Sequence, residues 1–281
     1  MIGAAMDESI FDRWKKDPRP TEELIRLAIA EQDEERKWEL ITVLHFRATR
    51  EVLEAAEGLC ASGEPEERQL GANILGQLGP RESAFPNERF ECLSRTLEGE
   101  ADADVIQGIA IAFGHLNDPR AIPLLLPFVE HPDSDVRWGV VHGMSTHSDG
   151  RAIHALIRLS NDNDDEIRNW ALFGLGTLTD YDSPDLRNAL AERLNDPYVE
   201  ARLEALVGLA RRKDNRALDP LLESLSAKEV DELALEAAQE LANPQLVPAL
   251  LELKRKWAGD NDRLVADLDS AIAACQQSLS P

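Results

Sequence analysis

Hydrophobic and polar positions recur along the chain with a period close to that of a short helical repeat. The copies align on an aliphatic anchor residue, and the anchors lie 31, 31, 32 and 31 residues apart: Val105, Val136, Ile167, Val199 and Val230. Apolar residues follow the anchor at +4, +7 and +8, the spacing of one face of an α-helix. A fixed period of this length predicts a repeat architecture.

A second helical pattern follows the anchor helix in each copy. It begins after an Asp-Pro or Asp-Gly turn, as in "DPRAIPLLLPFVE" and "DGRAIHALIRLS". A proline in the first turn or a capping aspartate is a typical helix start. One such helix pair cannot bury both of its apolar faces, whereas stacked pairs bury them against each other. The pattern therefore predicts an all-α stack of helix pairs.

The repeated segments resemble the HEAT-repeat family, in particular the short HEAT-like repeats of the phycobilin-lyase type. The segments that carry the resemblance are "SDVRWGVVHGM", "DEIRNWALFGLGTL", "GHLNDPRAIPLLL" and "DNRALDPLL". The resemblance implies a right-handed α-solenoid (superhelix) of about seven HEAT-like helix pairs. We expect one domain over 1–281, with an N-terminal cap at 1–19, repeats over 20–258 and a C-terminal capping helix at 259–281.

The same resemblance assigns a structural role to several arginines and aspartates. Arg137 and Arg168 follow the anchors directly, and an aspartate stands two residues before each of Arg120, Arg151 and Arg216. In similar repeats these residues bond to backbone ends and to each other between layers. We expect them to be architecture rather than a phosphate-binding cluster.

Charge and cysteine usage narrow the classes of partner. The 30 basic and 53 acidic residues give a formal charge of −23, which opposes binding to phosphate backbones and anionic membranes. The charge either keeps the protein soluble or attracts a basic partner. No run of eighteen apolar residues occurs, so we expect no membrane span. The scattered Cys60, Cys92 and Cys275 form no CxxC pair, which favours a cytoplasmic protein.

The histidines do not form a recognisable site. His142 and His147 are five residues apart, a poor spacing for sharing an ion on one helix, and His154 falls on the next helix. There is no HExxH motif and no His-Glu pair, and no glycine-rich phosphate loop occurs. We therefore predict no metal, no cofactor and no catalytic centre.

The positions two and six residues after the anchor should point into the groove on the concave side of a HEAT-like solenoid. In the central copies these positions hold large amphipathic side chains, which we predict to bind a partner: Gln107, Ile111, Trp138, His142, Asn169 and Phe173. The same rule places Ile41, Ala201 and Ala205 in the groove. The alternative is that side chains of adjacent layers only cover each other.

These observations predict a non-catalytic scaffold or adaptor that grips a partner protein on its concave face. We expect a monomer whose acidic surface favours a basic partner. Two alternatives remain open. One is a bilin-lyase-like protein for chromophore attachment, in which Trp138, His142 and Phe173 would flank the pigment. The other is an immunity or inhibitor protein that neutralises an enzyme through nucleic-acid-like charge.

Overall fold

The computed structural model describes residues 14–79, 84–257 and 262–277, and over these residues it contains sixteen α-helices and no strand. The chain divides into two compact units, Met1–Gly143 and Met144–Pro281. Residues 1–13 of the predicted N-terminal cap lie outside the described residues. The prediction of an all-α fold is confirmed.

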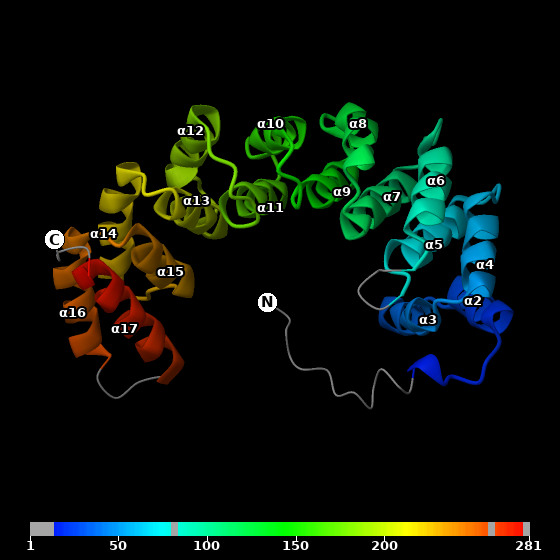
Figure 1. The fold of residues 1–281 in the computed structure, drawn as a ribbon, viewed down its shortest axis with the longest axis horizontal. Coiled ribbons are helices and arrows are strands. Elements are labelled where there is room, and N and C mark those ends of the chain that lie inside the picture. Colours follow the sequence, from blue (N-terminus) through cyan, green and yellow to red (C-terminus); the bar gives the residue numbers. More distant parts are fainter. Residues whose placement is uncertain (1–13, 80–83, 258–261, 278–281) are drawn as a thin grey trace. The chain divides into compact units, whose positions relative to one another are not determined.

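Helices of the first unit form two layers (Figure 1). One layer contains the anchor helices α3 (Glu34–Arg47), α5 (Pro65–Gly76), α7 (Ala103–Leu116) and α9 (Ser134–Met144, whose last residue belongs to the second unit). The other layer contains the paired helices α2 (Thr21–Ala30), α4 (Arg50–Cys60), α6 (Pro86–Leu97) and α8 (Ile122–Leu125). Neighbouring anchor helices such as α5 and α7 pack directly on each other.

The second unit repeats the same arrangement. Its anchor helices are α11 (Asp165–Gly176), α13 (Val199–Arg211), α15 (Glu232–Leu241) and α17 (Asp262–Gln277). Their partners are α10 (Gly150–Leu159), α12 (Pro184–Glu192), α14 (Leu218–Ser226) and α16 (Val247–Lys256). The final helix α17 packs against α15 and α16. None of the helices described in either unit is both long and apolar enough to cross a membrane.

Aspartate caps set where several anchor helices begin. The side chains of Asp33, Asp102, Asp164 and Asp231 accept a hydrogen bond from a backbone N–H in the first turn of α3, α7, α11 and α15. Such a cap satisfies one of the free N–H groups at a helix start and contributes about 1 kcal/mol. In α7 and α11 the predicted anchor lies three residues after the cap.

The predicted core positions are correct in the central copies. Val105, Ile109, Ala112 and Phe113 of α7 are at most 1% exposed, and so are Val136, Val140 and Met144 of α9. At about 25 cal/mol per Å² of apolar surface, these continuous buried rows supply the main favourable term in folding.

The predicted anchor of α13 is wrong. Val199 is 50% exposed, whereas Ala201 and Ala205 are fully buried. Counting three residues from the helix cap at Tyr198 gives Ala201 as the anchor. Gly208 then lies at +7, where Gly143 lies in α9. The copy is displaced by two residues because Val199 mimics an anchor at the first turn of the helix.

The predicted structural role of the arginines is confirmed. Arg168 donates hydrogen bonds to the carboxylate of Asp196 and to the carbonyls of Asp162 and Asn163. Arg137 donates to the carbonyls of His131 and Pro132. The pairs formed by Arg120, Arg151 and Arg216 with the aspartates two residues before them are also present: Asp118, Asp149 and Asp214.

Arg89 is a fully buried arginine that the sequence did not single out. Its guanidinium donates to the carbonyls of Leu75, Gly76 and Leu78, which end α5 and begin the following loop. The last carbonyls of a helix have no partner within the helix. Arg89 of α6 therefore ties the C-terminus of α5 to the next helix pair.

Candidate partner-binding surface

Four of the six predicted binding residues lie together in the first unit. With Gln69 and Asn73 of α5 they occupy the +2 and +6 positions of three successive anchor helices. We call this set the unit 1 row: Gln69, Asn73, Gln107, Ile111, Trp138 and His142. All six side chains are half-buried. They are neither core residues nor freely exposed, and both alternatives, partner contact and mutual covering, stay open.

Small residues at +3 let the anchor helices of the first unit approach closely. A Cβ atom on Gly139 of α9 would lie 3.0 Å from the carbonyl oxygen of Gln107, too close for any larger residue without a shift. A Cβ on Gly108 of α7 would lie 3.3 Å from Asn73 Oδ1 and 3.5 Å from Gln69 Cγ. The side chains of Gln69 and Asn73 therefore pack against Gly108, in the contact between α5 and α7.

Trp138 and His142 form the most distinctive pair of the unit 1 row. They are four residues apart on α9, and their ring centroids are 4.0 Å apart with an angle of 52° between the planes. Burial lowers the pKa of His142 to about 4, with a further contribution from the nearby His115. The imidazole is therefore neutral at neutral pH. The pair presents an indole and a neutral imidazole, the kind of aromatic surface that is enriched at protein interfaces.

The other two predicted residues, Asn169 and Phe173, lie on α11 in the second unit. Both are half-buried. Trp170 packs edge-on against Phe173, with ring centroids 5.7 Å apart and an angle of 88° between the planes. The Oδ1 atom of Asn169 is buried and accepts no hydrogen bond from the part of the chain that the structure describes. This group forms a second, separate aromatic and amide surface.

Sequence reasoning missed Trp38. Ile41 was predicted to face the groove, but it is fully buried, and this prediction is wrong. The cap at Asp33 places the +2 position of α3 at Trp38, which is 41% exposed. The aliphatic alignment failed here because the anchor position of α3 holds a charged residue, Arg36. The N-cap aspartate was the signal that could have given the register.

The displaced register of α13 overturns two further predictions. Ala201 and Ala205 do not face a groove but are fully buried. The +2 and +6 positions of α13 are Leu203 and Val207, which are 7% and 0% exposed. Aromatic and amide side chains therefore occupy the +2 and +6 positions of α11, whereas the same two positions of α13 hold aliphatic side chains.

The three histidines of the segment 142–154 are distributed over different environments. His142 is half-buried, His147 is buried and His154 is exposed. Within residues 14–79, 84–257 and 262–277, no group of three or more His, Cys, Asp or Glu side chains is arranged to hold a metal ion.

Comparison with known protein families and structures returns repeat proteins. A family model described as HEAT repeats matches residues 92–176 and 158–242. Over 89 residues the chain is 37% identical to Protein YibA of Escherichia coli (strain K12), a stretch that is 32% of this chain and 31% of YibA. The sequence match thus spans about a third of the length of this curated relative.

Two solved structures are similar over nearly the whole chain. The X-ray structure of E. coli YibA has a TM-score of 0.75 and 25% identity and is aligned over 98% of both chains. An engineered protein has a TM-score of 0.54 and 16% identity, with 95% of this chain and 84% of that chain aligned, and shows similarity of fold alone.

Proposed function

Because the chain belongs to the HEAT-repeat family, which commonly mediates protein interactions, we propose that it is a non-catalytic scaffold or adaptor that binds a partner protein through its anchor helices. The observation that carries this proposal is the tilted contact between the Trp138 and His142 rings, beside Gln107 and Ile111. Tryptophan is enriched among the few interface residues that carry most of the binding energy, and amides at the margin supply adaptable hydrogen bonds. Asn169, Phe173 and Trp170 are proposed as a second contact of the same kind.

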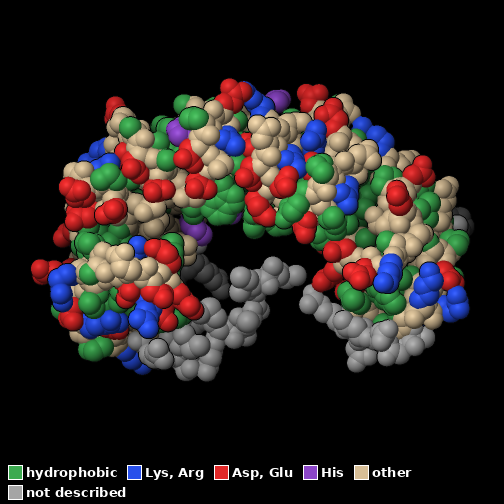
Figure 2. All heavy atoms as spheres, turned by 180° about the vertical axis from the view of Figure 1, so that it is seen from behind, with side chains coloured by type: hydrophobic (Ala, Val, Ile, Leu, Met, Phe, Trp, Pro, Cys, Tyr) green, Lys and Arg blue, Asp and Glu red, His purple; other side chains and the backbone are tan. Residues whose placement is uncertain are grey.

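The charge of the chain supports a basic partner. Figure 2 shows Asp and Glu side chains over helices of both units, with fewer Lys and Arg side chains among them. A formal charge of −23 speeds the encounter with a positively charged protein, and the effect weakens as salt is added. Cys60, Cys92 and Cys275 are free, buried thiols, which fits the cytoplasmic location that we propose.

The proposal is tested by affinity capture on the full chain, followed by a binding titration with each purified partner. We expect Trp138→Ala to weaken the interaction by about 30-fold, since truncating a central aromatic anchor costs about 2 kcal/mol. Adding Phe173→Ala should weaken it further if one partner uses both contacts. Light scattering on the free chain should give a monomer.

The control is Leu251→Ala, which truncates an apolar side chain of α16 that is 47% exposed. This variant should retain the partner at wild-type affinity, and circular dichroism should show that all variants are folded. A partner that binds Trp138→Ala plus Phe173→Ala as tightly as the wild type would refute the assignment of both surfaces.

A further inference from the structure

Two ion pairs join successive helix pairs at one recurring position. Arg68, directly after the anchor position of α5, pairs with Glu100 at 2.7 Å. Arg168, directly after the anchor of α11, pairs with Asp196 at 2.8 Å. Each acidic residue stands five positions before the anchor of the next copy. Each arginine also donates to two carbonyls just before its own helix, as Arg168 does to Asp162 and Asn163. We call these contacts the interlayer ion pairs.

The next copy has both residues of this ion pair but does not form it. Arg202 follows the anchor Ala201, and Glu229 stands five positions before Ala234, which lies three residues after the cap of α15. Arg202 makes the expected hydrogen bonds to the carbonyls of Asp196 and Pro197. Across the described ranges it makes no ion pair. Its remaining N–H groups and the carboxylate of Glu229 are therefore available.

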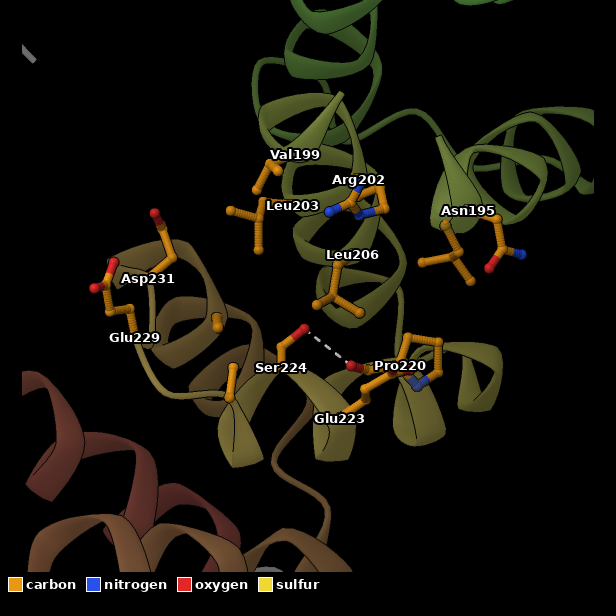
Figure 3. Close-up of a pocket in the computed structure, with 13 residues that line it drawn as sticks. Asn195, Val199, Arg202, Leu203, Leu206, Pro220, Glu223, Ser224, Glu229 and Asp231 are labelled. Carbon is orange, nitrogen blue, oxygen red and sulfur yellow. Dashed lines mark hydrogen bonds between the residues drawn. The ribbon is translucent and has the colours of Figure 1, made fainter. Parts of the chain in front are cut away.

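A pocket of about 410 Å³ lies where the ion pair would close (Figure 3). It is formed by α13, α14 and the segment that enters α15. Leu203 and Leu206 of α13 line it, and both are buried, while Val199 at its margin is 50% exposed. The pocket belongs wholly to the second unit and contains none of the residues proposed above for partner binding.

The polar groups of the pocket are dominated by carboxylates. Glu223, Glu229 and Asp231 line it, against one arginine, Arg202. Figure 3 shows Glu229 and Asp231 on the opposite side of the pocket from Arg202 and Leu206. The hydroxyl of Ser224 donates to the carbonyl of Pro220 at 3.0 Å and keeps its oxygen as an acceptor. The result is an apolar floor with a net negative margin.

We propose that this pocket docks a short segment of a basic partner protein, which inserts an aliphatic side chain flanked by lysine or arginine. The inserted side chain would contact Leu203, Leu206 and Val199, and the flanking cations would face Glu223, Glu229 and Asp231. Arg202 would donate to a backbone carbonyl of the segment. The volume lies within the roughly 300–1,000 Å³ typical of ligand pockets. This inference goes beyond the proposed function because it concerns a different surface.

The test is fluorescence anisotropy of the full chain with three labelled peptides, KKLLKK, KKSSKK and EELLEE, at about physiological salt. Burying a leucine side chain contributes about 1.5–3 kcal/mol, so KKLLKK should bind at least about tenfold more tightly than KKSSKK. Charge complementarity predicts the same preference over EELLEE.

Substitutions then locate the binding site. Val199→Arg places a bulky cation at the exposed margin and should weaken KKLLKK binding at least about tenfold. Glu223→Gln plus Glu229→Gln should weaken it by about threefold to tenfold, since each exposed ion pair contributes up to about 1 kcal/mol. The matched control is Glu51→Gln plus Glu54→Gln on α4, two exposed residues whose replacement changes the net charge equally. It should bind KKLLKK within about twofold of the wild type.

Three results would overturn the proposal. One is equal binding of KKLLKK and KKSSKK. Another is equal loss of binding in the pocket and control variants, which would mean that total charge alone attracts the peptide. The third is a dimer in light scattering that Val199→Arg dissociates, because the pocket would then be occupied by a second copy of the chain. Trp138→Ala should leave KKLLKK binding unchanged, so this proposal and the proposed function can fail separately.

Discussion

The Arg168–Asp196 ion pair offers the sharpest test of how successive helix pairs are held together. Its two side chains are 7% and 0% exposed, and two hydrogen bonds of 2.9 and 2.8 Å join them. The substitution Asp196→Asn removes the negative charge and keeps the size of the side chain. The new amide can still accept from the N–H of Tyr198, a bond that Asp196 makes at 3.0 Å. The change also removes the charge that pairs with Arg193 at 3.5 Å, so it tests the ion pairs of Asp196 together, of which the one with Arg168 is the shorter and more buried.

The expected cost follows from what remains around Arg168. Removing one partner of a buried ion pair costs about 3–5 kcal/mol because the other charge is left uncompensated. Arg168 keeps its bonds to the carbonyls of Asp162 and Asn163 and to Asp165, but the side chain of Asp165 is 58% exposed and compensates weakly. We therefore expect the lower end of the range, a loss of about 3 kcal/mol in the free energy of unfolding.

The assay is urea unfolding followed by circular dichroism, combined with hydrogen exchange of the amides in α11 and α13. Exchange is needed because repeat proteins can unfold in parts, and a local loss would be averaged in the global signal. The control is Arg255→Gln. The Arg255–Glu252 pair has side chains that are 73% and 47% exposed, and its loss should leave the unfolding midpoint unchanged.

The pH dependence adds a second criterion. Burial acts to raise the pKa of Asp196, but the hydrogen bonds from Arg168 and from the N–H of Tyr198 outweigh it and lower the pKa. The stability that the carboxylate contributes is thus present above its unfolded pKa of about 3.9 and is lost as the pH falls through the lower folded value. The difference between wild type and Asp196→Asn should shrink in acid. A cost no larger than that of Arg255→Gln, or a difference that persists in acid, would refute the reasoning.

Three further predictions concern positions that the structure singles out. Arg89→Met should cost at least about 4 kcal/mol in urea unfolding, because several buried carbonyls lose their donor; a loss below about 1 kcal/mol would contradict the proposed capping of α5. Gly208→Ala should destabilise by about 1–3 kcal/mol, because its Cβ would lie 2.7 Å from the Cα of Gly176, whereas Gly58→Ala, with nothing within 4 Å, should stabilise by about 0.5–1 kcal/mol. Burial raises the pKa of Glu204 to about 7, so stability should fall as the pH rises from about 4.5 through 7. Glu204→Gln should therefore stabilise by roughly 1–3 kcal/mol at about pH 8 and not near pH 4; equal effects at both values would exclude the shifted pKa.

The repeat period and the aspartate caps were enough to predict the fold. Helix pairs form wherever an apolar stripe of period 3.6 follows a capping residue, and both features are local in sequence. The core positions of α7, α9 and α11 were predicted correctly from this apolar spacing. The same local signals failed in α3, where Arg36 stands at the anchor position, and in α13, where the exposed Val199 imitates one. They also failed in α15, where the predicted anchor Val230 precedes the helix and the buried Ala234 holds the anchor position. In these helices the N-cap position, and not the aliphatic residue, defines the register.

The candidate surfaces were only half predictable. Trp138 and His142 stand out in the sequence because they are large at repeat positions that face away from the core, and their spacing of four residues on α9 allows the rings to meet. Their partial burial depends on the packing of α9 against α7, where Gly139 lies close to Gln107. Trp38 could be assigned to the +2 position only once the structure showed where α3 begins.

The sequence by itself determined the repeating helix pairs, their cores and the acidic character of the surface, because each depends on short-range periodicity or on composition. Tertiary structure alone decided which charges meet between successive helix pairs. Arg168 and Arg202 stand at equivalent positions, with an acidic residue five positions before the next anchor in both cases, yet only Arg168 forms the ion pair. An ion pair requires its two groups to lie within about 4 Å, and that separation depends on how neighbouring helix pairs stack rather than on the spacing of residues along the chain.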